Sequence, residues 1–175
     1  MGRPATPAAA RGCFGLTRLK IRIIALGHRM PQWVRDVTQE YTQRMPREMP
    51  VALIELKPEA RSGGRTTEQV LETEAQRILS ALPDHGMTLY ALDEHGTPWS
   101  THDLAKAMQT ALPQGTDLYF VIGSADGLHP RIKQRAQSLL SLSRMTLPHG
   151  MARAILVEQL YRAAMILKGH PYHRE

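Results

Sequence analysis

Apolar and polar residues follow one another along the chain in a pattern that predicts alternating strands and helices. Short runs rich in Ile, Val and Leu are typical of buried strands, and apolar residues three and four apart indicate helices. The predicted strands are 19–26, 51–57, 87–92, 117–122 and a short fifth one at 145–147. The predicted helices are 33–44, 67–82, 100–112, about 130–140, and 151–168. This alternation predicts the α/β class, with a parallel sheet covered by helices on both faces.

The chain has 175 residues, enough for one domain with a substantial core. Residues 1–18 are rich in Pro, Ala, Gly and Arg and lack a hydrophobic period, so they predict a disordered extension before a single domain, 19–175. An Arg-rich start without acidic residues also resembles an organellar transit peptide, and an early start codon is a third interpretation. No stretch is long enough to span a bilayer, so we expect no membrane partner.

The single cysteine, Cys13, excludes an intrachain disulfide framework and a Cys-rich zinc site. A reducing cytoplasm fits this composition, and we expect a cytoplasmic protein. His149, His170 and His173 are candidate metal ligands, but no short ligand spacing such as HExxH is present. We therefore expect no metal site.

The formal net charge of +6 is distributed unevenly. Residues 19–127 carry 11 basic and 14 acidic residues, whereas residues 128–175 carry eight basic and two acidic ones. A basic last quarter predicts that a polyanion meets the C-terminal region. The competing interpretation is a solvated helix face. The polyanion is favoured because four arginines lie within apolar or His-rich segments: Arg144, Arg153, Arg162 and Arg174.

Three segments concentrate residues suited to chemistry. Residues 122–128 follow a predicted strand and contain two glycines, and open α/β sheets bind ligands at the carboxyl ends of their strands. Residues 143–150 place polar residues, Pro, His and Gly in quick succession. The chain end, 170–175, holds two imidazoles, a phenol and a guanidinium, which suggests that the C-terminus closes a site. Taken singly, each segment also fits an ordinary turn or surface contact.

Six motifs occur in order along residues 19–175: MPQWV at 30–34, Leu92-Asp93 with 96–99, the Ile-Gly-x-x-(Asp/Glu)-Gly-Leu loop at 122–128, TLPH at 146–149, LYRA at 160–163 and the terminal HPYHRE. In this order they resemble the RlmH, or YbeA-like, family of SPOUT-class RNA methyltransferases. The terminal block is very specific. Together the motifs leave little room for coincidence.

The resemblance implies a fold, a reaction and partners. The implied fold is an α/β/α SPOUT domain with a C-terminal trefoil knot, which periodicity alone does not indicate. The implied reaction is S-adenosylmethionine-dependent methylation of N3 of a pseudouridine. The implied substrate is helix 69 of 23S ribosomal RNA on the assembled ribosome, and the implied assembly is a homodimer.

Carried over by position, the resemblance also assigns residues. It places cofactor contacts at Leu92, Gly123, Ser124, Ser143, Arg144, Met145, Thr146, Leu147 and Pro148. It places RNA contacts at His149 and Arg153, and catalytic contacts at Arg162, Tyr172, His173 and Arg174. One loop departs from the family pattern Gly-Gly-Pro-Glu-Gly, because Ser124 and Ala125 stand in place of Gly and Pro. This departure predicts a looser turn and weaker cofactor binding, with activity retained.

N3 of pseudouridine carries a proton at neutral pH, which must leave before or during attack. His149 and His173 suit a general base, whereas Arg162 and Arg174 suit stabilisation of the anion, and we favour the arginines. Three other functions stay open. They are methylation of another RNA base, a non-catalytic ribosome-associated module, and a nucleotide-binding α/β protein, against which the lack of a phosphate-loop signature counts.

Overall fold

A computed structural model of the chain describes residues 18–173, with His173 as backbone only. The predicted extension, 1–18, thus lies outside the described residues except for Arg18. Strands and helices alternate throughout this range. Their bounds are β1 (Ile21–Leu26), α1 (Gln32–Arg44), β2 (Val51–Leu56), α2 (Thr67–Ala81), β3 (Met87–Pro98), α3 (Thr101–Gln114), β4 (Asp117–Ile122), α4 (Pro130–Arg135), β5 (Ser138–Ser141), α5 (His149–Leu167) and a 3₁₀ turn, η1 (Pro171–His173).

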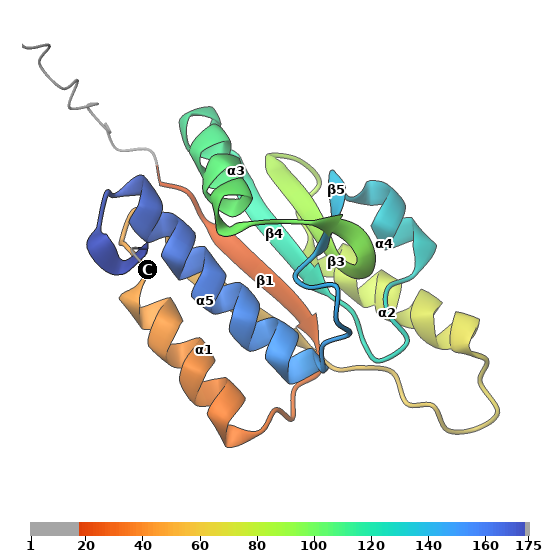
Figure 1. Cartoon of the computed structure of the whole chain (residues 1–175). Coiled ribbons are helices and arrows are strands. Elements are labelled where there is room, and N and C mark those ends of the chain that lie inside the picture. The colour runs from red at the N-terminus through yellow and green to blue at the C-terminus, as the bar shows by residue number, and fades with distance from the viewer. Residues whose placement is uncertain (1–17, 174–175) are drawn as a thin grey trace, which may run out of the picture.

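The strands form one parallel sheet in the order β2-β1-β4-β3-β5. Along β4 the side chains alternate between faces, so Leu118 and Phe120 belong to one buried cluster and Tyr119 and Val121 to the other. Helices α1, α3 and α5 cover the first face, and α2 and α4 cover the second (Figure 1). The predicted α/β class is confirmed. The knot implied by the resemblance stays a prediction.

Most predicted elements are confirmed to within a few residues, and two helix starts are fixed by capping boxes. Thr66 Oγ1 accepts the Gln69 backbone N–H at 3.2 Å, and the Gln69 side chain accepts the Thr66 N–H at 3.0 Å. Ser100 and Asp103 exchange the same pair of bonds before α3. Because both ends of each pair satisfy free backbone donors, α2 and α3 begin where the hydroxyl residues predict.

The predictions for the segment between residues 130 and 147 are wrong. Helix α4 ends at Arg135, the fifth strand is Ser138–Ser141, and residues 145–147 form a loop. Ile132, Ala136 and Leu139 have helical spacing, which favours a longer helix locally. In the fold this segment instead pairs with the free edge of β3, beginning where the Gln137 N–H donates to the Leu89 carbonyl at 2.7 Å. Tertiary pairing therefore overrides the local period.

Strand β3 is interrupted where it pairs with β5. Leu92 and Thr97 both lie opposite Leu140, so residues 93–96 loop out of the ladder. At Gly96 a Cβ atom would lie 2.7 Å from the Leu139 carbonyl carbon, so only glycine fits at this crossing. The loop carries two carboxylates, those of Asp93 and Glu94, to the wall of a pocket.

Candidate active site

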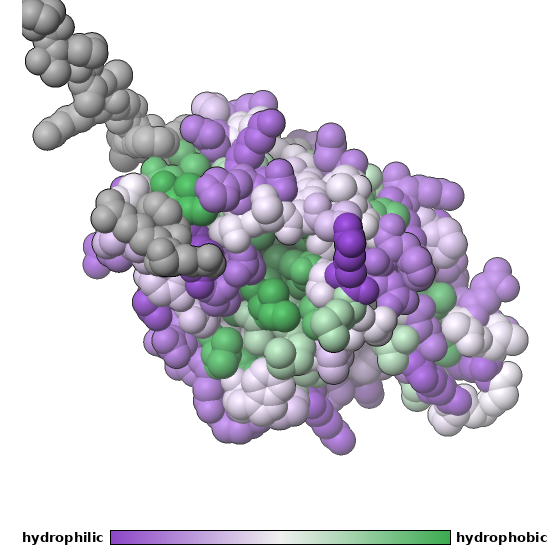
Figure 2. Space-filling model, in the orientation of Figure 1, coloured by the Kyte–Doolittle hydropathy of each residue, from purple (hydrophilic) through white to green (hydrophobic). Residues whose placement is uncertain are grey.

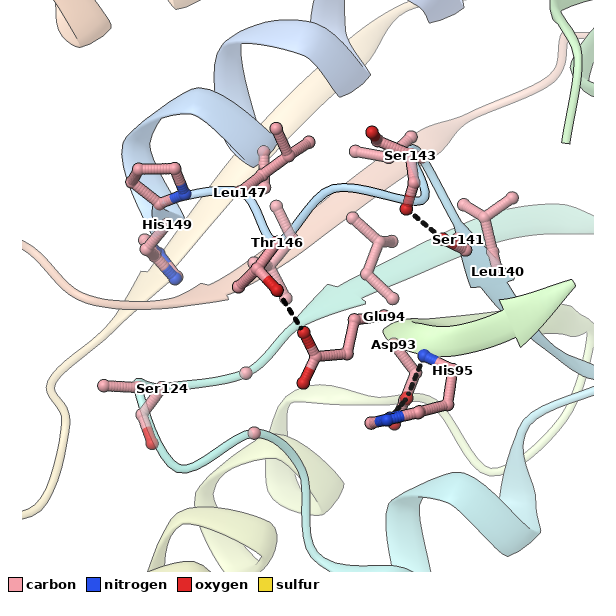
Figure 3. A pocket seen from close by; sticks show the side chains of 18 of the residues that line it. Asp93, Glu94, His95, Ser124, Leu140, Ser141, Ser143, Thr146, Leu147 and His149 are labelled. Carbon is pink, nitrogen blue, oxygen red and sulfur yellow. Dashed lines mark hydrogen bonds and ion pairs between the residues drawn. The ribbon is translucent and has the colours of Figure 1, made fainter. Parts of the chain in front are cut away.

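A pocket of about 600 Å³ lies at the bulge of β3 and the carboxyl ends of β4 and β5. Its walls come from three separate stretches, 92–95, 122–127 and 140–149 without Arg144, together with Lys133 and Ala152 (Figure 3). This is the edge at which open α/β sheets bind ligands, and the volume suits a small molecule.

Nearly all of the predicted cofactor residues line this one pocket. Arg144 is the exception, because it is exposed and does not line the pocket. The structure brings together Leu92, Gly123, Ser124, Ser143, Met145, Thr146, Leu147 and Pro148.

The loop after β4 folds back on itself tightly. Ser124 and Gly127 form an isolated bridge, and the Gly127 N–H donates to the Ser124 carbonyl at 3.0 Å. Gly127 takes the left-handed conformation, with φ of 83°. A Cβ atom at Gly123 would lie 2.3 Å from the Gly127 oxygen, a distance that no side chain permits. The shape of this pocket wall therefore depends on glycine at both positions.

Ser124 has a partner that a glycine would lack. Its hydroxyl donates to Glu74 at 2.8 Å, and the Glu59 N–H donates to the other carboxylate oxygen at 3.0 Å. Glu74 is only 2% exposed, and a buried carboxylate is costly unless its oxygens are hydrogen-bonded. Arg61 adds an ion pair with Asp126 at 2.8 Å. Ser124 thus gives the loop a hydrogen bond to Glu74 that a glycine could not make, whereas the sequence predicted only a looser turn.

Carboxylates dominate the charge on the pocket wall. Asp93 pairs with Lys133 at 2.5 Å and accepts the His95 N–H at 2.9 Å. Burial by itself raises the pKa of Asp93, but these two partners outweigh it and hold the pKa below its usual value. Glu94 accepts a bond from Thr146 at 2.8 Å across the pocket (Figure 3). Of the three carboxylates on the wall, Asp93 is paired with Lys133 and Asp126 with Arg61, whereas Glu94 bonds a neutral hydroxyl and favours a cationic ligand.

His149, in the first turn of α5, lines the same pocket as a neutral ring. Arg153 lies 3.2 Å from Nε2, and because a guanidinium only donates, Nε2 accepts. The ring also hydrogen-bonds the backbone of Gly123. Burial lowers the pKa of His149, and the charge of Arg153 lowers it further, while the Gly123 bond opposes them. With both ring nitrogens engaged, His149 does not suit the general-base role considered from the sequence.

Arg153 is buried within the domain. Only 1% of it is exposed, and its guanidinium bonds the carboxylate of Glu55, the Gly27 carbonyl at 2.9 Å and His149. A phosphate has no access to this group, so the structure does not fit the predicted contact of Arg153 with RNA. The contacts instead fix the orientation of the His149 ring.

Residues 19–173 match the family model described as predicted SPOUT methyltransferase. The chain belongs to the SPOUT methyltransferase family. Proteins named ribosomal RNA large subunit methyltransferase H from Burkholderia lata, Burkholderia ambifaria and Burkholderia cenocepacia are each 53% identical to it over 156 residues. The aligned region covers 89% of this chain and 99% of each relative. The family resemblance inferred from the motifs is confirmed.

In this SPOUT domain two of the predicted catalytic residues, Arg162 and Tyr172, lie away from the pocket. At about 1.5 Å per residue, Arg162 is about 20 Å beyond His149 along α5. Neither Arg162 nor Tyr172 lines the pocket. Arg162 donates to Glu158 at 2.8 and 3.1 Å and to the Tyr172 carbonyl at 3.5 Å. The His173 side chain and Arg174 lie outside the described residues. Within one chain, therefore, Arg162 and Tyr172 do not join the predicted cofactor residues.

Three acidic residues that shape the pocket were not predicted as site residues. Asp93 and Glu94 directly follow the predicted strand 87–92, so the rule that pointed to residues 122–128 also points to them. Glu74 lies between Val70 and Ile78 on the buried stripe of α2, and an acid at a core position signals a buried polar contact.

In the described range, no group of three or more His, Cys, Asp or Glu residues could hold a metal ion. None of the helices in that range combines the length and apolar character needed to cross a membrane.

Proposed function

We propose that this protein uses S-adenosylmethionine to methylate N3 of a pseudouridine in helix 69 of 23S ribosomal RNA, on the assembled ribosome in the cytoplasm, as a homodimer. The observation that carries the proposal is 53% identity over nearly the full length of relatives named ribosomal RNA large subunit methyltransferase H. The basic character of residues 128–175 supports a polyanionic substrate.

The pocket wall fits the proposed cofactor in size, polarity and charge. Leu92, Leu140 and Leu147 offer apolar surface, while Glu94 offers negative charge. S-adenosylmethionine carries a positive sulfonium and supplies an electrophilic methyl group. Carboxylates nearby favour its binding.

Arg162 has the central role in the proposed chemistry. The N3–H bond must break, and the proton leaves to solvent or to His173, because both ring nitrogens of His149 are engaged. A guanidinium beside the base stabilises the resulting anion without exchanging a proton. Tyr172, which lies against Arg162, is suited to stacking on the base.

A homodimer accounts for the distance between Arg162 and the pocket. Trp33, Met145 and Met151 are 46%, 76% and 40% exposed, and apolar side chains gather over the middle of α5 (Figure 2). Exposed apolar patches of this kind mark interaction surfaces. A second copy on this face, in the opposite orientation, places Arg162 and Tyr172 of one subunit beside the pocket of the other.

The direct test is methylation of ribosomes with labelled cofactor. We expect 70S ribosomes lacking the modification to accept one methyl group at N3 of a helix 69 pseudouridine, as mapped by mass spectrometry of RNA fragments. Label on a different base would support the alternative of another SPOUT methyltransferase specificity. A protein that does not bind S-adenosylmethionine would support the ribosome-associated module instead.

Mixed dimers test whether Arg162 of one subunit acts at the cofactor pocket of the other. Arg162→Ala and Gly123→Ala are each expected to be inactive. After joint refolding, one site in each mixed dimer combines an intact pocket from one subunit with an intact Arg162 from the other. Random pairing then restores about a quarter of wild-type methylation. Each variant refolded alone is the control. If the mixture stays as inactive as the controls, Arg162 acts at the pocket of its own chain and the dimer proposal fails.

A further inference from the structure

Arg44, the last residue of α1, lies among three tyrosines from three parts of the fold. Its guanidinium carbon is 5.4 Å from the ring centroid of Tyr41, 4.7 Å from that of Tyr161 and 5.3 Å from that of Tyr172. These rings belong to α1, α5 and η1 in turn. Cation–π attraction to all three holds Tyr172 against the two helices.

Hydroxyl contacts strengthen this cluster. Tyr172 donates to Glu158 at 3.3 Å, and its oxygen lies 3.2 Å from the Tyr41 hydroxyl. Arg44 donates to the Tyr161 hydroxyl at 3.4 Å. Burial raises the pKa of Tyr172, and Tyr41 and Glu158 raise it further against a lowering by Arg162.

The backbone directs Tyr172 into the cluster. After α5, Gly169 takes a left-handed conformation with φ of 64°, and the His170 N–H donates back to the Met165 carbonyl at 2.9 Å. The Tyr172 N–H donates to Nδ1 of His170 at 3.2 Å. This turn brings the chain back toward α1, where Tyr41 and Arg44 meet the ring.

We propose that Tyr41 and Arg44 are positioning residues that hold Tyr172 in the geometry required for methyl transfer. The proposal rests on the proposed function, in which Tyr172 contacts the target base. A residue this close to a chain terminus ordinarily frays, so holding Tyr172 in place before the substrate arrives removes an entropic cost from the transfer step. Helix α1 thereby contributes to catalysis without touching the cofactor pocket.

The test compares Arg44→Leu, Arg44→Lys and Tyr41→Phe. We expect Arg44→Leu to lower kcat on ribosomes about tenfold, with the Kd for S-adenosylmethionine unchanged. Arg44→Lys keeps a cation and recovers part of the rate, and Tyr41→Phe keeps the ring and lowers kcat about threefold. Lys168→Met is the matched control, because it breaks an exposed ion pair with Glu48 at 2.6 Å near the same end of α5. Its kcat stays at the wild-type value.

A second measurement is independent of RNA. Release of the terminal residues by a broad-specificity carboxypeptidase is expected to be several-fold faster in Arg44→Leu than in wild type and Lys168→Met. A wild-type digestion rate together with a wild-type kcat in Arg44→Leu would overturn the proposal. A parallel loss of cofactor binding would overturn it too, because it would indicate general damage to the fold. If wild-type protein does not methylate ribosomes, the proposed function fails. The digestion rates still decide whether Tyr41 and Arg44 of α1 hold Tyr172 in place.

Discussion

Gly123→Ala is expected to abolish methyl transfer and to weaken binding of S-adenosylmethionine by at least about a hundredfold, a loss of about 2.7 kcal/mol. The added Cβ atom would lie 2.3 Å from the Gly127 oxygen and 2.6 Å from its carbonyl carbon. Both are backbone atoms, so they cannot turn aside as a flexible side chain does. The loop must open, which breaks the bridge between Ser124 and Gly127 and moves one wall of the pocket.

Calorimetric titration of the cofactor measures this effect. Gly86→Ala is the control for an added methyl group, since nothing lies within 4 Å of the added atom, although Gly86 has a positive φ of 76°. We expect it to lose about 1 kcal/mol of stability through backbone strain and to bind the cofactor normally. Wild-type affinity in Gly123→Ala would show that the pocket wall does not depend on the close approach of Gly127.

The sequence predicts the central strands of the sheet better than the edge strand β5. Strand β4 was predicted with its observed bounds, because six largely apolar residues stand between clear turn signals. Strand β5 was missed, because Leu139 and Leu140 fit a helix locally and only the free edge of β3 makes them a strand. Local patterns carry no information on which edge is free.

The same limit applies to the site. The rule for carboxyl ends of strands located the loop at 122–128, and the residue types located 143–150. The family resemblance then assigned cofactor contacts to 143–148, which except for Arg144 line the same pocket. The burial of Arg153 was not predictable, because it depends on Glu55, 98 positions earlier, which the sheet brings under α5. A lone arginine in an apolar helix suggests a ligand contact until its partner is placed.

Arg153→Met is expected to destabilise the protein by about 3 kcal/mol, near the lower end for a broken buried ion pair. The lower end applies because Glu55 is 37% exposed in its side chain and remains hydrated without its partner. Methylation falls as well, since the His149 ring loses the donor to Nε2 that orients it beside Gly123. Urea unfolding and the ribosome methylation rate measure the two effects. Glu55→Gln, which keeps an acceptor, is the milder control in both.

The pH dependence of stability follows from His149. Its folded pKa lies below the ordinary value of 6.5, so the unfolded chain binds a proton first and stability falls as the pH drops below that value. Removing the charge of Arg153 removes one cause of the lowered pKa. The His149 pKa therefore rises in Arg153→Met, and the loss of stability below pH 6.5 becomes shallower. An NMR titration of the imidazole, with urea unfolding at two pH values, checks the sign.

The salt dependence of ribosome binding separates this positioning role from a direct contact with RNA. A phosphate contact contributes about one unit to the slope of log affinity against log salt, so losing one makes the slope shallower. Because Arg153 is buried and held by protein groups, we expect Arg153→Met to keep the wild-type slope. A slope reduced by about one unit would return Arg153 to the RNA interface, which requires that α5 moves when the ribosome binds.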